Sequence, residues 1–174
     1  NGWLGQKSGQ GFYKKISKGN IHSLDLNTLE YSPQEKKRFT GVRLARQNIN
    51  SKMKIKTLAW SKDIAGEFTW EVFAKTLLYS ANLNGVISND LVNIDRAMRW
   101  GFGWELGPFE IWDAIGVSNS IERMKSEGRN IPGWIEGMLK NGHTSFYRYS
   151  DGALQYYDKE SEKYQLVSTH KKEI

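Results

Sequence analysis

The residues best suited to chemistry in this chain lie within residues 99–116, RWGFGWELGPFEIWDAIG. Glu105 and Glu110 stand on either side of Gly107–Pro108, and Asp113 follows Glu110 at a spacing that puts both on one helix face. Paired carboxylates can act as general acid and base. Acidic side chains also stabilise the positive end of a helix, and the residues alone favour that structural interpretation.

The same stretch is rich in aromatic residues and glycines. Aromatic side chains mixed with basic ones can stack on single-stranded nucleic acid. At a corner between helices, however, rings normally fill the space that glycine leaves open. The pattern therefore favours a packed core.

Other catalytic and metal-binding patterns are weak. The glycine-rich residues 2–11, GWLGQKSGQG, match neither the phosphate-binding loop nor the dinucleotide fingerprint, and they do not connect a strand to a helix. His22, His143 and His170 are far apart in the sequence, so no metal site is expected. There is no cysteine, which excludes disulfides and thiolate chemistry and is compatible with a reducing cytoplasm.

The 174 residues carry a formal charge of +6, with 39% hydrophobic and 25% charged residues, as in ordinary globular domains. Basic residues cluster only in EKKR (35–38) and KMKIK (52–56). A basic chain can bind nucleic acid or an anionic cofactor, but a solvated surface is the favoured interpretation. The sequence contains no membrane-length apolar run, and no signal peptide is expected. Because it begins at Asn1 in a glycine-rich motif, it is expected to be part of a longer protein.

Periodicity and capping residues predict mostly helices. A loop over residues 1–13 and an extended connector over 21–31 are followed by a helix over 34–48, after Pro33. The remaining expected elements are helices over residues 63–83, 89–100, 108–115, 120–127 and 132–140, a hairpin around 150–152, a third strand at 163–167 and a polar tail.

Residues 95–116, DRAMRWGFGWELGPFEIWDAIG, resemble the C-terminal domain signature of the 3-hydroxyacyl-CoA dehydrogenases. That pattern reads Asp-x-Ala-Met-x-x-Gly-x-Gly, then Pro-Met-Gly-Pro-Phe-Glu-Leu, then Asp-x-x-Gly. The matching residues are Asp95, Ala97, Met98, Gly101, Gly103, Gly107, Pro108, Phe109, Glu110, Asp113 and Gly116. Residues 2–13, GWLGQKSGQGFY, resemble the motif that closes the family's first helical unit.

The order of these motifs is similar to that in long enzymes with two C-terminal units, often beside an enoyl-CoA hydratase domain. The resemblance implies three parts. Residues 1–50 would be the tail of a first unit and a connector, residues 51–142 a second helical unit, and residues 143–174 a hairpin and linker. The expected fold is mainly α, of the 6-phosphogluconate dehydrogenase C-terminal-like type, with a small C-terminal β-hairpin.

The sequence departs from the family pattern where a catalytic unit would be most constrained. Glu105–Leu106 replaces Pro-Met, and Lys75 and Thr76 stand where the family has a substrate-contacting Asn and its Arg neighbour. The family's catalytic His and Glu belong to a nucleotide-binding domain upstream. This unit is therefore expected to hold no catalytic, cofactor-binding or metal-binding residue. A structural or interface role is expected for Gly107, Pro108, Phe109, Glu110 and Trp112.

The resemblance implies a parent enzyme of fatty-acid β-oxidation that oxidises L-3-hydroxyacyl-CoA with NAD in the cytoplasm. The chain would support the acyl-CoA cleft or the packing of domains or subunits, and would be inactive alone. Its partners would be the upstream domains, the parent's acyl-CoA substrate, a hydratase domain and a second copy, with no membrane or nucleic acid. Self-association is expected through Phe68, Val72, Phe73 or Leu77. The alternative is a basic helical module that binds nucleic acid or serves as a scaffold.

Overall fold

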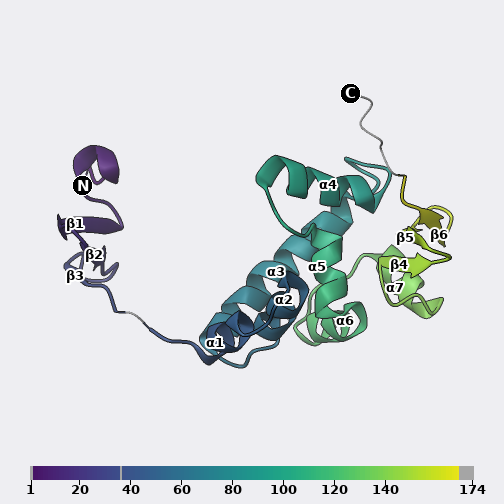
Figure 1. Ribbon diagram of the computed structural model, residues 1–174, viewed down its shortest axis with the longest axis horizontal. Helices are drawn as coiled ribbons and strands as arrows, with labels where there is room; N and C mark the ends of the chain where they lie inside the picture. The colour runs from purple at the N-terminus through teal and green to yellow at the C-terminus, as the bar shows by residue number, and fades with distance from the viewer. Residues whose placement is uncertain (1, 36, 169–174) are drawn as a thin grey trace. The chain divides into compact units, whose positions relative to one another are not determined.

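The computed structural model describes residues 2–35 and 37–168. The chain forms two compact units, residues 1–38 and residues 39–174. Figure 1 labels the elements of both. Each unit is described by itself.

The first unit is a small antiparallel sheet. A 3-10 turn, η1 (Gln6–Ser8), precedes three strands paired in sequence order: β1 (Tyr13–Ser17), β2 (Asn20–Leu24) and β3 (Tyr31–Pro33). Residues 1–13 and 21–31 were predicted as a loop and an extended connector, so the sheet was missed. The reason is that most of the side chains of β1 and β3 are exposed, which removes the alternation that marks a half-buried strand.

The second unit begins with α1 (Thr40–Arg46), which is shorter than the helix predicted over residues 34–48. Phe39 is extended, and the carboxylate of Asp63 accepts a hydrogen bond from Gly41 N at 2.7 Å, in the first turn of α1. Charged residues in the 34–38 segment have no apolar face to bury, and helix propensity alone rarely sustains a short helix.

Six further helices follow: α2 (Ser51–Ala59), α3 (Ile64–Leu83), α4 (Leu91–Phe102), α5 (Pro108–Ile115), α6 (Val117–Ser126) and α7 (Gly133–Lys140). The predicted cap of α3 is confirmed, because the Asp63 side chain accepts a hydrogen bond from Gly66 N at 3.0 Å. The predicted start of α5 at Pro108 and its end at Gly116 are confirmed as well. Helix α5 packs against α2, α3, α4 and α6, which makes it central to the unit.

The C-terminal strands are β4 (Tyr147–Ser150), β5 (Ala153–Asp158) and β6 (Lys163–Leu166), paired antiparallel in that order. The hairpin turns at Asp151–Gly152, where both residues have positive φ, and the predicted third strand is present. The sheet contacts α4 and α5 (Figure 1). Of the predicted polar tail, residues 169–174, which include His170, lie outside the described residues.

One apolar core joins the helices to the sheet. Its fully buried members include Leu77 of α3, Phe109 and Trp112 of α5, Phe146 before β4 and Tyr157 of β5. The predicted mainly-α class with a small C-terminal β-element is therefore confirmed. The division into family units at residues 50 and 142 stays a prediction. No helix in the described part of the chain has the length and apolarity needed to cross a membrane.

Candidate functional site

The Gly107–Pro108 corner is held by a carboxylate from the preceding helix. Asp95, on α4, accepts hydrogen bonds from Phe109 N at 2.8 Å and Glu110 N at 3.1 Å. These are among the free N–H groups that open α5, and the N-cap residue, Gly107, has no side chain to satisfy them. Asp95 therefore caps α5 from another helix.

Gly107 is required here by close approach rather than by backbone conformation. A Cβ at this position would lie 2.3 Å from Asp95 Cβ and 2.4 Å from Asp95 Cα. Its φ of −76° is accessible to any residue. The Glu110 carboxylate completes the cap by accepting from Gly107 N at 2.8 Å, and it pairs with Arg99 at 3.3 Å.

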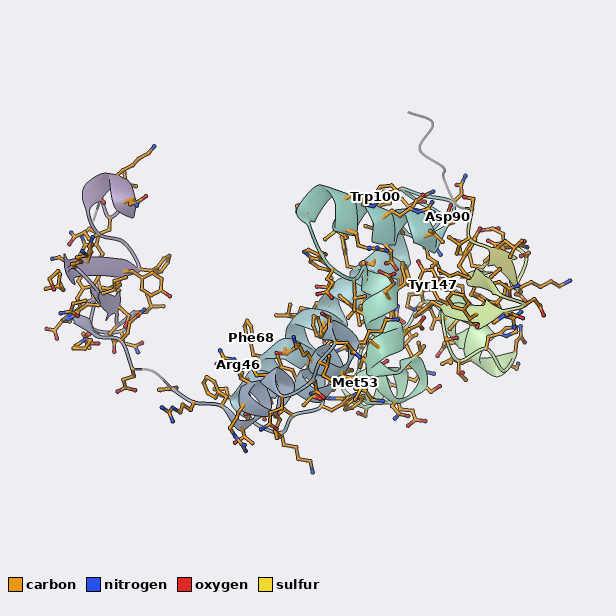
Figure 2. The ribbon with its side chains drawn as sticks, in the orientation of Figure 1. Arg46, Met53, Phe68, Asp90, Trp100 and Tyr147 are labelled. Atoms are coloured by element: carbon orange, nitrogen blue, oxygen red, sulfur yellow. The ribbon has the colours of Figure 1, made fainter. Side chains whose placement is uncertain are left out.

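A second buried carboxylate fastens the sheet to the same helix. Asp113 accepts hydrogen bonds from Phe146 N at 2.7 Å and Tyr147 N at 2.8 Å. The Tyr147 hydroxyl, labelled in Figure 2, donates to Asp95 at 3.0 Å. Two aspartates of the signature therefore join α4, α5 and β4.

Burial dominates the electrostatics of this corner. Desolvation raises the pKa of Asp95 to about 7, although hydrogen bonds from Phe109 N and the Tyr147 hydroxyl oppose the shift. Burial raises the pKa of Asp113 to about 7 as well, although hydrogen bonds from two backbone amides lower it in part. The pKa of Tyr147 is raised by burial and by the neighbouring Asp95. Each of these groups favours its neutral form more than it would in water.

The aromatic rings of the corner pack against one another in the core. Phe109 and Trp112 are both fully buried and lie 5.0 and 5.2 Å, centroid to centroid, from Phe146. Trp112 Nε1 donates to the Ser120 hydroxyl at 2.6 Å, so its one polar group is satisfied. Such pairs stabilise by geometry as well as by burial.

This arrangement fits a structural role better than acid–base catalysis. Glu110 and Asp113 are each occupied by backbone N–H groups, whereas Glu105 is exposed. The residues alone favoured carboxylates that stabilise the positive end of a helix, and Glu110 has this role. Asp113 instead accepts a hydrogen bond from the backbone just before a strand. This role depends on Phe146, which lies more than thirty residues away in the sequence.

Of the five predicted motif residues, Gly107, Pro108, Phe109 and Trp112 are buried and Glu110 is half-buried. They are therefore internal to this unit, and their proposed interface role stays a prediction. Sequence reasoning missed the partnership of Asp95 with Tyr147. The signal for Asp95 was its place in the family pattern, but nothing in the sequence indicated Tyr147.

The preceding residues of the same stretch behave differently. Trp100, labelled in Figure 2, is 72% exposed, Phe102 is 76% exposed and Trp104 is 36% exposed. The Arg96 guanidinium lies 5.6 Å from the centroid of the Trp100 ring, a cation–π distance. The core predicted for the whole aromatic stretch is thus correct only for its second half.

Helix α3 also presents an apolar surface to solvent. Four of its apolar residues lie on one side: Ile64, Phe68, Val72 and Tyr79. Their side chains are 65%, 71%, 44% and 66% exposed, in that order. Figure 2 labels Phe68. These four residues are called the α3 stripe below. Of the predicted association residues, Phe68 and Val72 belong to it. Leu77 does not, because it is fully buried on the opposite side of α3.

The glycine-rich residues of the first unit do not fit a dinucleotide phosphate. They form the turn η1 and lead into strand β1, whereas a pyrophosphate site needs a glycine turn that opens a helix. No group of three or more candidate metal ligands occurs in the parts of the chain that the structure describes. His143 packs between the rings of Tyr157 and Tyr164, at 5.4 and 5.1 Å.

The geometry defines a helical domain whose signature residues build a hydrogen-bonded corner between α4, α5 and β4. No family model and no solved structure matches the chain. The chain is 47% identical, over 173 residues, to a Bacillus subtilis protein named probable 3-hydroxyacyl-CoA dehydrogenase. It is also 29% identical, over 119 residues, to a Rickettsia prowazekii protein named putative fatty acid oxidation complex trifunctional enzyme.

The predicted resemblance is therefore confirmed: the chain corresponds to a region of the 3-hydroxyacyl-CoA dehydrogenase family. The match covers 99% of this chain but only 22% of the Bacillus relative and 15% of the Rickettsia relative. The chain thus spans about a fifth or less of the length of these relatives.

Proposed function

We propose that this chain is a non-catalytic helical unit of an NAD-dependent L-3-hydroxyacyl-CoA dehydrogenase of fatty-acid β-oxidation, in the cytoplasm. In that parent, a His base in another domain removes the hydroxyl proton while a hydride passes to the nicotinamide. This unit packs against the first C-terminal helical unit and so supports the acyl-CoA cleft.

The α3 stripe is the observation that carries the proposal. The opposite side of α3 is already buried, with Trp70, Ala74 and Leu77 each 2% exposed or less. The stripe shares its side of α3 with the Glu71–Lys75 ion pair, and a helix with apolar residues on both sides is normally covered in part by other elements. Exposed apolar surfaces of this kind mark sites of protein–protein contact.

The first unit supports the same interpretation. It exposes Leu4, Phe12 and Leu26 by 72%, 71% and 67%, and Gly11 is the only buried residue among those that the structure describes in this unit. A segment of this size without a core rarely folds alone. This small sheet therefore requires an apolar partner. Its glycine-rich motif resembles the one that closes the first C-terminal helical unit of the family, so we propose that helical unit of the parent as the partner.

Lys75 explains why this unit would not assist catalysis. It is exposed and pairs with Glu71 at 2.8 Å, on the same helix as the α3 stripe. An ammonium group donates hydrogen bonds only, so it cannot reproduce both the donor and the acceptor of the Asn amide at that position.

The test is complementation in trans. A Bacillus relative lacking its matching 173 residues is mixed with this chain, and complex formation and NADH production from 3-hydroxybutyryl-CoA are measured. We expect a complex with restored activity, and no turnover by the 174-residue chain alone. Turnover by this chain alone, or a truncated relative that stays fully active and never binds it, would overturn the proposal.

A matched pair of variants locates the contact. Tyr79→Asp, in the α3 stripe, should abolish the complex, because it puts a charge into an apolar interface. Tyr149→Asp alters a tyrosine of similar exposure, 77%, in the C-terminal sheet and should leave the complex unchanged. Equal loss in both variants would show that the stripe is not the contact.

A further inference from the structure

The sequence contains three Asn-Gly pairs, at residues 1–2, 84–85 and 141–142. The structure describes both residues of the last two pairs, and in each the asparagine directly follows a helix. Because glycine has no side chain, its backbone nitrogen can approach the side-chain amide carbon of a preceding asparagine with little steric hindrance. One fold therefore holds the same reactive pair in two places.

The pair after α3 is held firmly. Asn84 is only 4% exposed, and the backbone N–H of Gly85 donates to Ser88 O at 2.6 Å. The ammonium of Lys159 donates to Asn84 O at 2.9 Å and lies so close to Gly85 that a Cβ there would be 2.2 Å from it. This backbone cannot rearrange unless its neighbours move as well.

The pair after α7 is open. Asn141 and Gly142 are both exposed, and no atom lies within 4 Å of the place that a Cβ on Gly142 would occupy. Gly142 N donates to Leu139 O at 3.0 Å, but this bond belongs to the last turn of an exposed helix end, which opens more readily than a buried segment. The Asn141 side-chain amide donates to Glu162 at 3.2 Å, in the turn between β5 and β6 (Figure 1).

We propose that Asn141 is a site of spontaneous deamidation and that the fold protects Asn84 from the same reaction. Gly142 N loses its proton and bonds to Asn141 Cγ, the Cγ–Nδ2 bond breaks, and the amide nitrogen leaves as ammonia. A water molecule then adds to one of the two carbonyl carbons of the resulting five-membered ring. The ring opens to an aspartate or an isoaspartate at position 141, so water is the one co-reactant.

The new carboxylate would act on the contact between α7 and the β5–β6 turn. It replaces the amide that donates to Glu162, so a hydrogen bond is lost and two negative charges face each other. A negative charge at the C-terminal end of a helix is also unfavourable, because that end of the helix dipole is negative. Deamidation should therefore weaken the link between α7 and the C-terminal sheet.

The first test follows the reaction in the folded chain. The 174-residue chain is incubated in mildly alkaline buffer, and the peptides that contain positions 84 and 141 are quantified by mass spectrometry, with isoaspartate separated by chromatography. Position 141 should react about tenfold faster than position 84 or more, because Asn84 must wait for local unfolding. Equal rates, a faster reaction at Asn84 or no reaction at Asn141 would overturn the proposal.

The matched control is the same incubation in denaturant. Both pairs are then freed from the fold, and their rates should converge to within a few-fold of each other. If the difference between the two positions were as large in the unfolded chain as in the folded one, the neighbouring sequence would set the rates, and the proposed protection by the fold would be wrong.

Variants test the consequence for the fold. Asn141→Asp carries the charge of the product, whereas Asn141→Ser removes the same amide without adding charge. Because residue 141 is exposed, both variants should fold, and Asn141→Asp should melt at the lower temperature. Glu162→Gln should shrink this difference, since it removes the opposing charge. Equal melting of the two variants, or a difference that Glu162→Gln leaves unchanged, would refute the proposed effect on the link.

Discussion

Residues 99–104 and 107–116 are neighbours in sequence and similar in composition, yet the structure treats them in opposite ways. Phe109 and Trp112 are fully buried, whereas Trp100 and Phe102 are more than 70% exposed. The difference does not lie in residue type. It arises because Asp95, Asp113 and the C-terminal sheet close over the second segment, while no described element covers the first.

The largest effect expected from this comparison concerns the buried ring. Phe109→Ala should cost about 3–5 kcal/mol of unfolding free energy, because it removes a fully buried aromatic side chain and leaves a cavity. Denaturant unfolding measures this directly. A loss below about 1 kcal/mol would contradict the structural interpretation of the corner.

Two of the four glycines of residues 99–116, Gly107 and Gly101, should change the stability in opposite directions when replaced by Ala. Gly107→Ala should destabilise by about 1–3 kcal/mol or more, because its Cβ would overlap Asp95. Gly101→Ala should stabilise by about 0.5–1 kcal/mol, because Gly101 lies within α4 with open space around it. Thermal melts of both variants provide the comparison. Destabilisation by both would mean that residues 99–104 are packed as well.

A pH effect should follow from the buried aspartates of the second segment. The pKa values of Asp95 and Asp113 are raised to about 7 in the folded chain, from an ordinary value near 3.8. Between these values the folded state binds more protons than the unfolded state, so stability should fall as the pH rises from about 4.5 to about 7.5. The nearby carboxylate of Glu110 adds to both shifts, whereas Lys52 opposes that of Asp113.

The control for this effect is Asp95→Asn, which keeps the shape of the side chain and removes its titration. Unfolding free energies at pH 5 and pH 7.5 should differ less in this variant than in the unmodified chain. An identical pH dependence in both would exclude Asp95 as a source of the effect.

The smallest effect is expected in the exposed segment. Phe102→Ala should change the unfolding free energy by no more than about 0.5 kcal/mol, as is usual for a surface position. The measurement is the same denaturant series used for Phe109→Ala. A loss of unfolding free energy close to that of Phe109→Ala would show that Phe102 is packed like Phe109 and would contradict the difference between the two segments.

The sequence by itself determined much of the second unit. Capping by Asp63, the start of α5 at Pro108 and the turn at Asp151–Gly152 depend on local chemistry, which a short segment contains in full. The family pattern likewise pointed to Gly107, whose type is required by its close approach to Asp95. The predicted helix over residues 34–48 was wrong in its first part, since local propensity does not supply a surface to bury against.

Only the tertiary structure decided which face of each element is covered. The contact of Tyr147 with Asp95 joins segments that are more than 50 residues apart in the sequence. The exposure of the α3 stripe and the burial of Leu77 depend on how whole helices pack. An apolar side chain has the same chemistry whether it faces a core or a partner. Its role therefore follows from what lies next to it in space, which periodicity does not encode.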